Sequence, residues 1–221
     1  MANASFTRDE AILALDVLYS SDEKTPSANS DSIRELCKLL QNLPIHPTAN
    51  RRPDFRNESG VSRQLSLFRN SYRQKKKDPN VGEVFYNVAL EFESDPKRIH
   101  HIAEAIRKNA SWFECSFGAL YEDEGFPEGT LLGHLHRIVE RRDGKKVPLS
   151  ERCSICQLEP ELLYKPCGNL LEQHLIVDPC SIDPTKKYAV NDFITVCPNC
   201  HAALHRVRPW LNKKTCEALL R

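Results

Sequence analysis

Two closely spaced cysteine pairs in the last third of the chain are the residues best suited to metal chemistry. Cys153 and Cys156 form one C-x2-C pair, Cys197 and Cys200 form the other, and 40 residues separate the two pairs. Each pair can sit on a tight turn that directs two thiolates to one point, and two such turns supply the four tetrahedral ligands that zinc prefers. The spacing therefore predicts a structural Zn2+ that holds together a domain with too little core of its own.

Three histidines near the second cysteine pair predict another metal site. His201 and His205 are four residues apart, so both imidazoles share one face of a helix. His174 lies in the apolar segment 170–177, which we expect to be a strand. A divalent ion held by these three side chains would keep positions open for water and a phosphate oxygen, which suits phosphodiester hydrolysis. The alternative is that His174 is a core histidine and the other two are spare zinc ligands.

These motifs, in chain order, form a pattern that resembles a known family. C-x2-C, then L-E-x-H, then V-C-P-N-C-H-x3-H resembles the HNH (ββα-metal) endonucleases of the McrA-like, modification-dependent restriction type. The resemblance covers Cys153 to about Trp210, and it extends more loosely over 128–142 and 55–70. It implies a β-hairpin followed by a helix around one catalytic Mg2+, Mn2+ or Ni2+.

The resemblance assigns roles to individual residues. His174 matches the first metal ligand, and His201 and His205 match the metal-contacting histidines of the final helix. The middle asparagine of the family pattern should lie about where this chain has Asp192. A histidine that acts as general base follows the first ligand in the family, but this chain has Leu175, which cannot accept a proton.

Leu175 leaves three explanations open. His174 itself is the base, with the strand shifted by one residue, although such a shift would turn it to the other sheet face. Alternatively, the protein binds without cutting. The hypothesis that the sequence favours is an inactivating His-to-Leu substitution, which a cleavage assay of Leu175→His would test.

The first half of the chain is predicted to be helical. Thr7 and Glu10 have the spacing of a capping box, before a helix that carries Ile12, Leu15 and Tyr19 on one face. Further amphipathic helices are predicted at 30–43, from Gly60 onward, at 81–92 and at 97–108.

These elements predict an α+β protein with an N-terminal all-helical domain followed by a small zinc-bound ββα-metal (HNH) domain. The expected domains are a helical DNA-recognition domain at 1–109, a connector at 110–150 and the nuclease domain at 151–221.

Charge is concentrated in one segment of the helical half. The whole chain has 31 basic and 30 acidic residues, but residues 51–77 contain nine basic and only two acidic ones, a net charge of +7. Such a segment attracts a phosphate backbone; the alternative is a solvated basic loop. DNA contacts are predicted for Arg51, Arg52, Arg56, Asn57, Arg63, Arg69, Lys75, Lys76 and Lys77.

The cysteine content and the apolar pattern bear on location. Nine cysteines is an odd number, the first residues lack the pattern of a leader, and no stretch approaches the roughly 18 apolar residues of a membrane span. We therefore expect a soluble cytoplasmic protein. The cysteines outside the two pairs are expected to be small buried residues: Cys37, Cys115, Cys167, Cys180 and Cys216.

The expected partner is double-stranded DNA. The resemblance adds modified cytosine as a candidate target and a homodimer as a candidate assembly, because cutting two strands needs two sites. Two other functions remain open: a non-catalytic zinc-ribbon adaptor that binds nucleic acid or protein, and a toxin-type RNase on the same fold.

Overall fold

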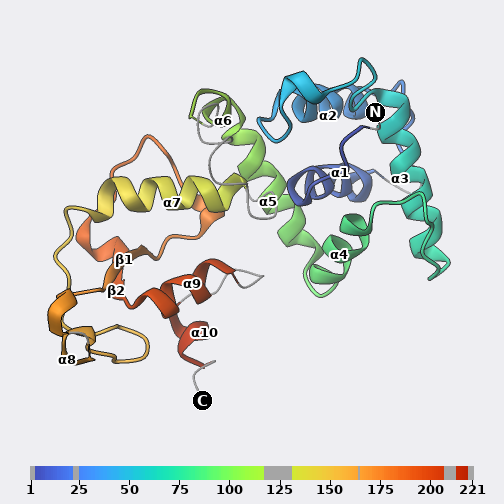
Figure 1. Ribbon diagram of the computed structural model, residues 1–221. Coiled ribbons are helices and arrows are strands. Elements are labelled where there is room, and N and C mark those ends of the chain that lie inside the picture. Colours follow the sequence, from blue (N-terminus) through green and yellow to red (C-terminus); the bar gives the residue numbers. More distant parts are fainter. Residues whose placement is uncertain (1–2, 22–24, 117–130, 164, 207–212, 219–221) are drawn as a thin grey trace. The chain divides into compact units, whose positions relative to one another are not determined.

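The chain folds into two compact units, Met1–Leu131 and Leu132–Arg221 (Figure 1). The computed structural model describes residues 3–21, 25–116, 131–163, 165–206 and 213–218. The first unit is helical, and the second combines helices with a small two-stranded sheet. The predicted α+β class is therefore confirmed.

In the first unit, helices pack around one central helix. Their bounds are α1 (Arg8–Ser20), α2 (Asp31–Asn42), α3 (Glu58–Arg73), α4 (Glu83–Glu91), α5 (Pro96–Lys108) and α6 (Ala110–Ser116).

Helix α1 is the centre of this unit. Half of the capping box predicted at Thr7 and Glu10 is formed: the Thr7 amide donates to Glu10 Oε2 at 2.8 Å, whereas Thr7 Oγ1 has no hydrogen-bond partner among the described residues. The prediction of a single apolar face is wrong, because Ala11 to Leu15 are all buried while Tyr19 is 45% exposed. Helices α2, α3, α4 and α5 all pack against α1, so almost every side of it faces protein (Figure 1).

Local capping explains where the neighbouring helices begin. Asn57 accepts a hydrogen bond from the Gly60 amide at 2.8 Å, so α3 begins at Glu58 rather than at the predicted Gly60. A Cβ at residue 60 would lie 2.8 Å from Asn57 Oδ1, which favours glycine there. Ser30 caps α2, and Pro96 opens α5 as the first helical residue.

The second unit contains the predicted ββα order. Its elements are α7 (Leu131–Gly144), α8 (Pro160–Leu163), β1 (Glu172–Leu175), β2 (Phe193–Val196), α9 (Pro198–Arg206) and α10 (Lys213–Ala218). Strands β1 and β2 are antiparallel, with Glu172 opposite Val196 and Leu175 opposite Phe193. Strand β2 leads through Cys197 into α9, which carries Cys200 and both helical histidines.

Helix α7 is the main difference from the sequence prediction. Residues 110–150 were expected to be a connector, but α7 is a regular helix, and the unit boundary falls at 131–132. Leu132, Leu135 and Val139 are buried at helical spacing, although the histidines and charges between them obscure that period in the sequence. The part of the expected connector from Leu132 onward therefore belongs to the second unit.

One buried apolar cluster of the second unit includes three cysteines. Its buried members are Cys153, Ile155, Leu171, Val196, Cys197, Cys200 and Leu204. None of the helices that the structure describes has the length and apolar character needed to cross a membrane.

Candidate metal centres

The four cysteines of the two pairs come together in the second unit. Their sulfur atoms all lie within 4.8 Å of one another, and the Sγ atoms of Cys156 and Cys197 are 3.7 Å apart. Zn–S bonds of about 2.3 Å in a tetrahedron place neighbouring sulfurs about 3.8 Å apart. The four thiols are therefore close enough together to hold a zinc ion, as the spacing predicted.

The local backbone favours this arrangement at the first pair. Gln157 adopts φ +62°, and its amide donates to the Cys153 carbonyl at 3.0 Å, which closes a tight turn around the pair. Burial raises the pKa of Cys153, but backbone amides of Cys156, Cys197 and Ile155 outweigh burial and lower that pKa to about 7. The backbone therefore favours the thiolate at Cys153, whereas burial raises the pKa of Cys156 and Cys200.

Two of the remaining cysteines are less buried than predicted. Cys37 is buried as predicted, but Cys167 is exposed and Cys180 is half-buried. Cys167 ends a short surface 3-10 helix, so no core is available to cover it. The side chains of Cys115 and Cys216 lie outside the described residues.

A second group of ligand atoms lies beside the sheet. It consists of Glu140 from α7, His174 from β1, and His201 and His205 from α9, whose donor atoms all lie within 4.8 Å of one another. Glu140 Oε1 is 2.8 Å from His201 Nε2 and 3.4 Å from His205 Nε2, and Oε2 is 3.0 Å from His174 Nδ1. The structure thus brings together all three predicted histidines and adds a carboxylate.

The spacing of these four donors fits a single ion. Metal–ligand bonds of about 2.1 Å at right angles, as around an octahedral ion, place neighbouring donors about 3.0 Å apart, within the observed 2.8–3.4 Å. The buried Nδ1 of His174 has no hydrogen-bond partner of acceptable geometry within the described residues. An ion between the four side chains would satisfy that atom, so the residues fit a metal.

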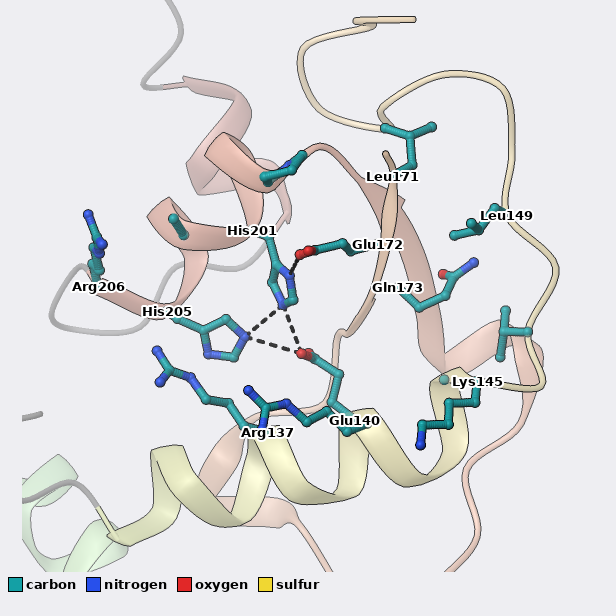
Figure 2. Close-up of a pocket in the computed structure, with 15 residues that line it drawn as sticks. Arg137, Glu140, Lys145, Leu149, Leu171, Glu172, Gln173, His201, His205 and Arg206 are labelled. Atoms are coloured by element: carbon teal, nitrogen blue, oxygen red, sulfur yellow. Dashed lines mark hydrogen bonds and ion pairs between the residues drawn. The ribbon is translucent and has the colours of Figure 1, made fainter. Parts of the chain in front are cut away.

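Glu172 orients one of the helical histidines. Its carboxylate is hydrogen-bonded to His201 Nδ1, while His201 Nε2 points to Glu140 and His205 (Figure 2). A carboxylate on the far nitrogen fixes the tautomer and ring orientation of a metal-binding imidazole and raises its basicity. The L-E-x-H motif therefore supplies a ligand and a positioning residue, because two-residue spacing places Glu172 and His174 on the same face of β1.

Helix α7 lies along the open edge of β1. His136 Nε2 donates to the carbonyl of Leu175 at 2.8 Å, and the amide of Leu175 donates to Glu140 Oε2 at 2.9 Å. His136 and Glu140 are one helical turn apart, so one face of α7 binds both backbone groups of Leu175. These bonds hold Glu140 over the three imidazoles.

Burial and mutual contact set the protonation of this group. Burial raises the pKa of Glu140, but the three surrounding imidazoles outweigh burial and lower that pKa below the usual range. Burial lowers the pKa of His136 to about 3 and also lowers that of His205. Burial likewise acts to lower the pKa of His201, but the adjacent carboxylates raise it overall.

The positions assigned to the base and to the middle motif residue lie apart from this group. The Leu175 side chain is 0% exposed and lies opposite Phe193, on the sheet face away from His174. Asp192 uses its carboxylate to accept from the Ala189 amide at 2.9 Å, in the turn before β2. Neither residue belongs to the cluster of metal-ligand atoms.

Several residues of the basic segment have structural partners within the first unit. Arg56 is 6% exposed and forms an ion pair with Glu10, with Nε–Oε1 at 2.7 Å. Arg51 donates to backbone carbonyls at the end of α2, and Arg69 donates to carbonyls at the end of α1. Asn57 caps α3. These contacts explain the residues without DNA.

The other members of the basic segment are exposed. Arg52 pairs with Asp54 at 3.1 Å, and Lys77 pairs with Glu83 at 3.1 Å. Arg73 is exposed, and the predicted DNA-contacting side chains that remain open to solvent are Arg63, Lys75 and Lys76. Their contact with DNA remains a prediction.

An open cleft of about 640 Å³ lies beside the histidine and carboxylate group, within the second unit. Glu140, Glu172, His201 and His205 line it together with four basic side chains (Figure 2). A polar molecule that enters this cleft therefore meets the candidate metal ligands directly.

Sequence reasoning missed Glu140, His136 and the cleft. A weak signal was present, since His136 and Glu140 share a helix face in an otherwise apolar pattern, but local spacing does not indicate what that face meets.

Comparison of the chain with protein-family models, with curated proteins and with solved structures finds no match. The likeness to HNH nucleases therefore rests on the motifs themselves, and its last residue, Trp210, lies outside the described residues.

Proposed function

We propose that this protein is a metal-dependent phosphodiester hydrolase of the HNH type, with double-stranded DNA as its substrate. The observation that carries the proposal is the convergence of Glu140, His174, His201 and His205 on one point beside an open cleft. A divalent ion at that point would offset charge on the scissile phosphate and on the leaving oxygen. The cysteine cluster would hold a structural Zn2+ at the start of the helix that carries His201 and His205.

The number of ligands restricts the catalytic ion. Four protein donors fill a tetrahedral ion, whereas a catalytic site needs an open position. An octahedral ion such as Mn2+, Mg2+ or Ni2+ would keep positions for water and for a phosphate oxygen. We therefore expect activity with an octahedral ion rather than with zinc in this second site.

The base for the attacking water differs from the one that the family resemblance implies. Leu175 cannot take that role, and its complete burial opposite Phe193 favours leucine as the residue that this fold accommodates. We expect Leu175→His to lower stability without a gain in cutting. Glu172 is the better proton acceptor, because its side chain is 51% exposed and lines the cleft.

The experiment that tests the proposal is cleavage of plasmid DNA with Mg2+, Mn2+ or Ni2+ by the wild type and by His205→Ala. Loss of a ligand should reduce the rate more than about 100-fold, because even outer-shell partners are worth about 10–100-fold. His101→Ala, which removes an exposed histidine of the first unit, is the matched control and should cut normally. Equal rates for His205→Ala and the wild type would overturn the proposal.

A second candidate function is a metal-stabilised nucleic-acid-binding module without hydrolysis. The complete four-ligand set and the apolar Leu175 favour it. A wild type that binds DNA but cuts neither plasmid nor single-stranded RNA with any of the three ions would support this alternative. Cutting of RNA alone would indicate an RNase on the same site.

A further inference from the structure

The cleft beside the candidate metal site has a cationic wall. Arg137, Arg141 and Lys145 line it at successive intervals of four residues, so they follow one face of α7 and of the turn after it. Arg206, near the end of α9, lines the same cleft. Arg141, Lys145 and Arg206 are exposed, and Arg137 is partly exposed.

These cations have no acidic partners in the described part of the chain, where no ion pair involves any of the four. Arg142, their neighbour, shows the contrast. Its guanidinium binds Asp143 at 2.7 Å and the carbonyl of Pro184, so it holds the loop before β2. One arginine of α7 is thus used by the fold. The four cations that line the cleft, here called the cleft row, keep their charge available for a ligand.

The row lies on both sides of the candidate metal ligands. Arg137 and Arg206 lie on the His205 side of Glu140, and Lys145 lies at the other end of the cleft (Figure 2). Four helical residues advance about 6 Å along the axis, and the phosphates of one DNA strand advance about 3.4 Å per nucleotide. Successive cations of the row are therefore about two nucleotide steps apart, so the row spans phosphates on both sides of one held at Glu140 and the histidines.

We propose that Arg137, Arg141 and Lys145, with Arg206, bind the phosphate backbone of one strand of duplex DNA and place it across the Glu140–histidine group. This inference rests on the proposed function for its substrate. It assigns the main phosphate contact to the second unit rather than to the basic segment 51–77. The row recognises repeated phosphates and no particular base.

The test compares two triple variants of the full-length protein. The cleft variant carries Arg137→Gln, Arg141→Gln and Lys145→Gln. The matched control carries Lys146→Gln, Lys165→Gln and Lys187→Gln, three exposed lysines of the same unit that do not line the cleft. Both remove the same charge. Equal zinc content and equal thermal midpoints would show that both variants fold.

Binding of a short fluorescein-labelled DNA duplex is measured by anisotropy between about 50 and 200 mM salt, without added Mg2+, Mn2+ or Ni2+. Each lost phosphate contact removes about 0.9 from the slope of log affinity against log salt, so the cleft variant should lose about 2.7. The control should keep the wild-type slope. Equal losses in both variants, no loss in the cleft variant, or tighter binding of single-stranded RNA than of the duplex would overturn the inference.

This measurement separates the inference from the proposed function. A wild type that binds the duplex through the cleft row but cuts nothing would refute hydrolysis and leave the inference standing. A wild type that cuts DNA while the cleft variant binds with an unchanged slope would refute the inference alone.

Discussion

Glu10 in the first unit and Glu140 in the second are both buried carboxylates, but their partners differ in kind. Glu10 binds the guanidinium of Arg56 through both oxygens, at 2.7 and 2.9 Å, and also contacts His46 at 3.0 Å. Glu140 lies among imidazoles and receives the Leu175 amide. Glu10 is thus paired with a side chain that is always a cation, whereas Glu140 is surrounded by side chains that can be neutral.

This difference separates a structural ion pair from a ligand set. A guanidinium stays charged at any pH at which proteins fold, so Glu10 and Arg56 complete one another. Neutral imidazoles carry no charge and present lone pairs, and those around Glu140 point to a common centre. A buried carboxylate beside several imidazoles therefore suits a metal ion, whereas one beside an arginine needs none.

The largest expected effect comes from removing a cysteine ligand. Cys197→Ser should lose the bound zinc and the fold of the second unit, because structural zinc contributes about 10–16 kcal/mol in small domains. Zinc content by mass spectrometry and resistance to trypsin measure this effect. Cys167→Ser, at an exposed cysteine, should change neither. Full zinc content in Cys197→Ser would contradict the cysteine site.

The ion pair of Glu10 can be broken from one side. Glu10→Gln leaves the Arg56 guanidinium buried without a counter-charge, which should lower the free energy of unfolding of the first unit by about 3–5 kcal/mol. Urea denaturation measures it, and metal content should not change. Glu104→Gln removes the 56% exposed partner of Arg107 and should cost less than about 1 kcal/mol. Equal costs would contradict the assignment.

The carboxylate of Glu10 also predicts that the stability of the first unit decreases in acid. Burial raises the pKa of Glu10, but His46 and Arg56 outweigh burial and lower that pKa below its ordinary value of 4.5. Its stabilising contribution is therefore fully present above about pH 4.5 and is lost as the pH falls through the lowered pKa. Urea denaturation at a series of acid pH values should show this loss in the wild type and a smaller loss in Glu10→Gln. Parallel pH curves would contradict it.

The smallest expected effect comes from Glu172, which contacts the candidate metal ligand His201. Glu172→Gln removes the carboxylate that orients His201 and should weaken Mn2+ binding about 10–100-fold. Calorimetric titration with Mn2+ measures this affinity. Glu161→Gln, at an exposed carboxylate of α8, is the control and should bind normally. Unchanged affinity in Glu172→Gln would show that Glu172 does not support the metal site.

The predictions that succeeded concern features fixed by short stretches of chain. The hydrogen bond from the Thr7 amide to Glu10 and the ββα order follow from local spacing. The failures concern packing: neighbouring helices bury α1 on several sides, whereas Tyr19 in its last turn is exposed, and α7 was expected to be part of a connector. Periodicity indicates that a residue is helical, but not how many sides of its helix are covered.

Sequence alone predicted most of the candidate metal ligands. Cys153 and Cys156 share one turn, and His201 and His205 share one face of a helix, because spacings of three and four residues fix such geometry locally. Only the tertiary structure decided that Glu140, 61 residues before His201, completes the ligand group. The reason is that α7 lies along the open edge of β1, where the Leu175 backbone binds Glu140, and no local spacing encodes that contact.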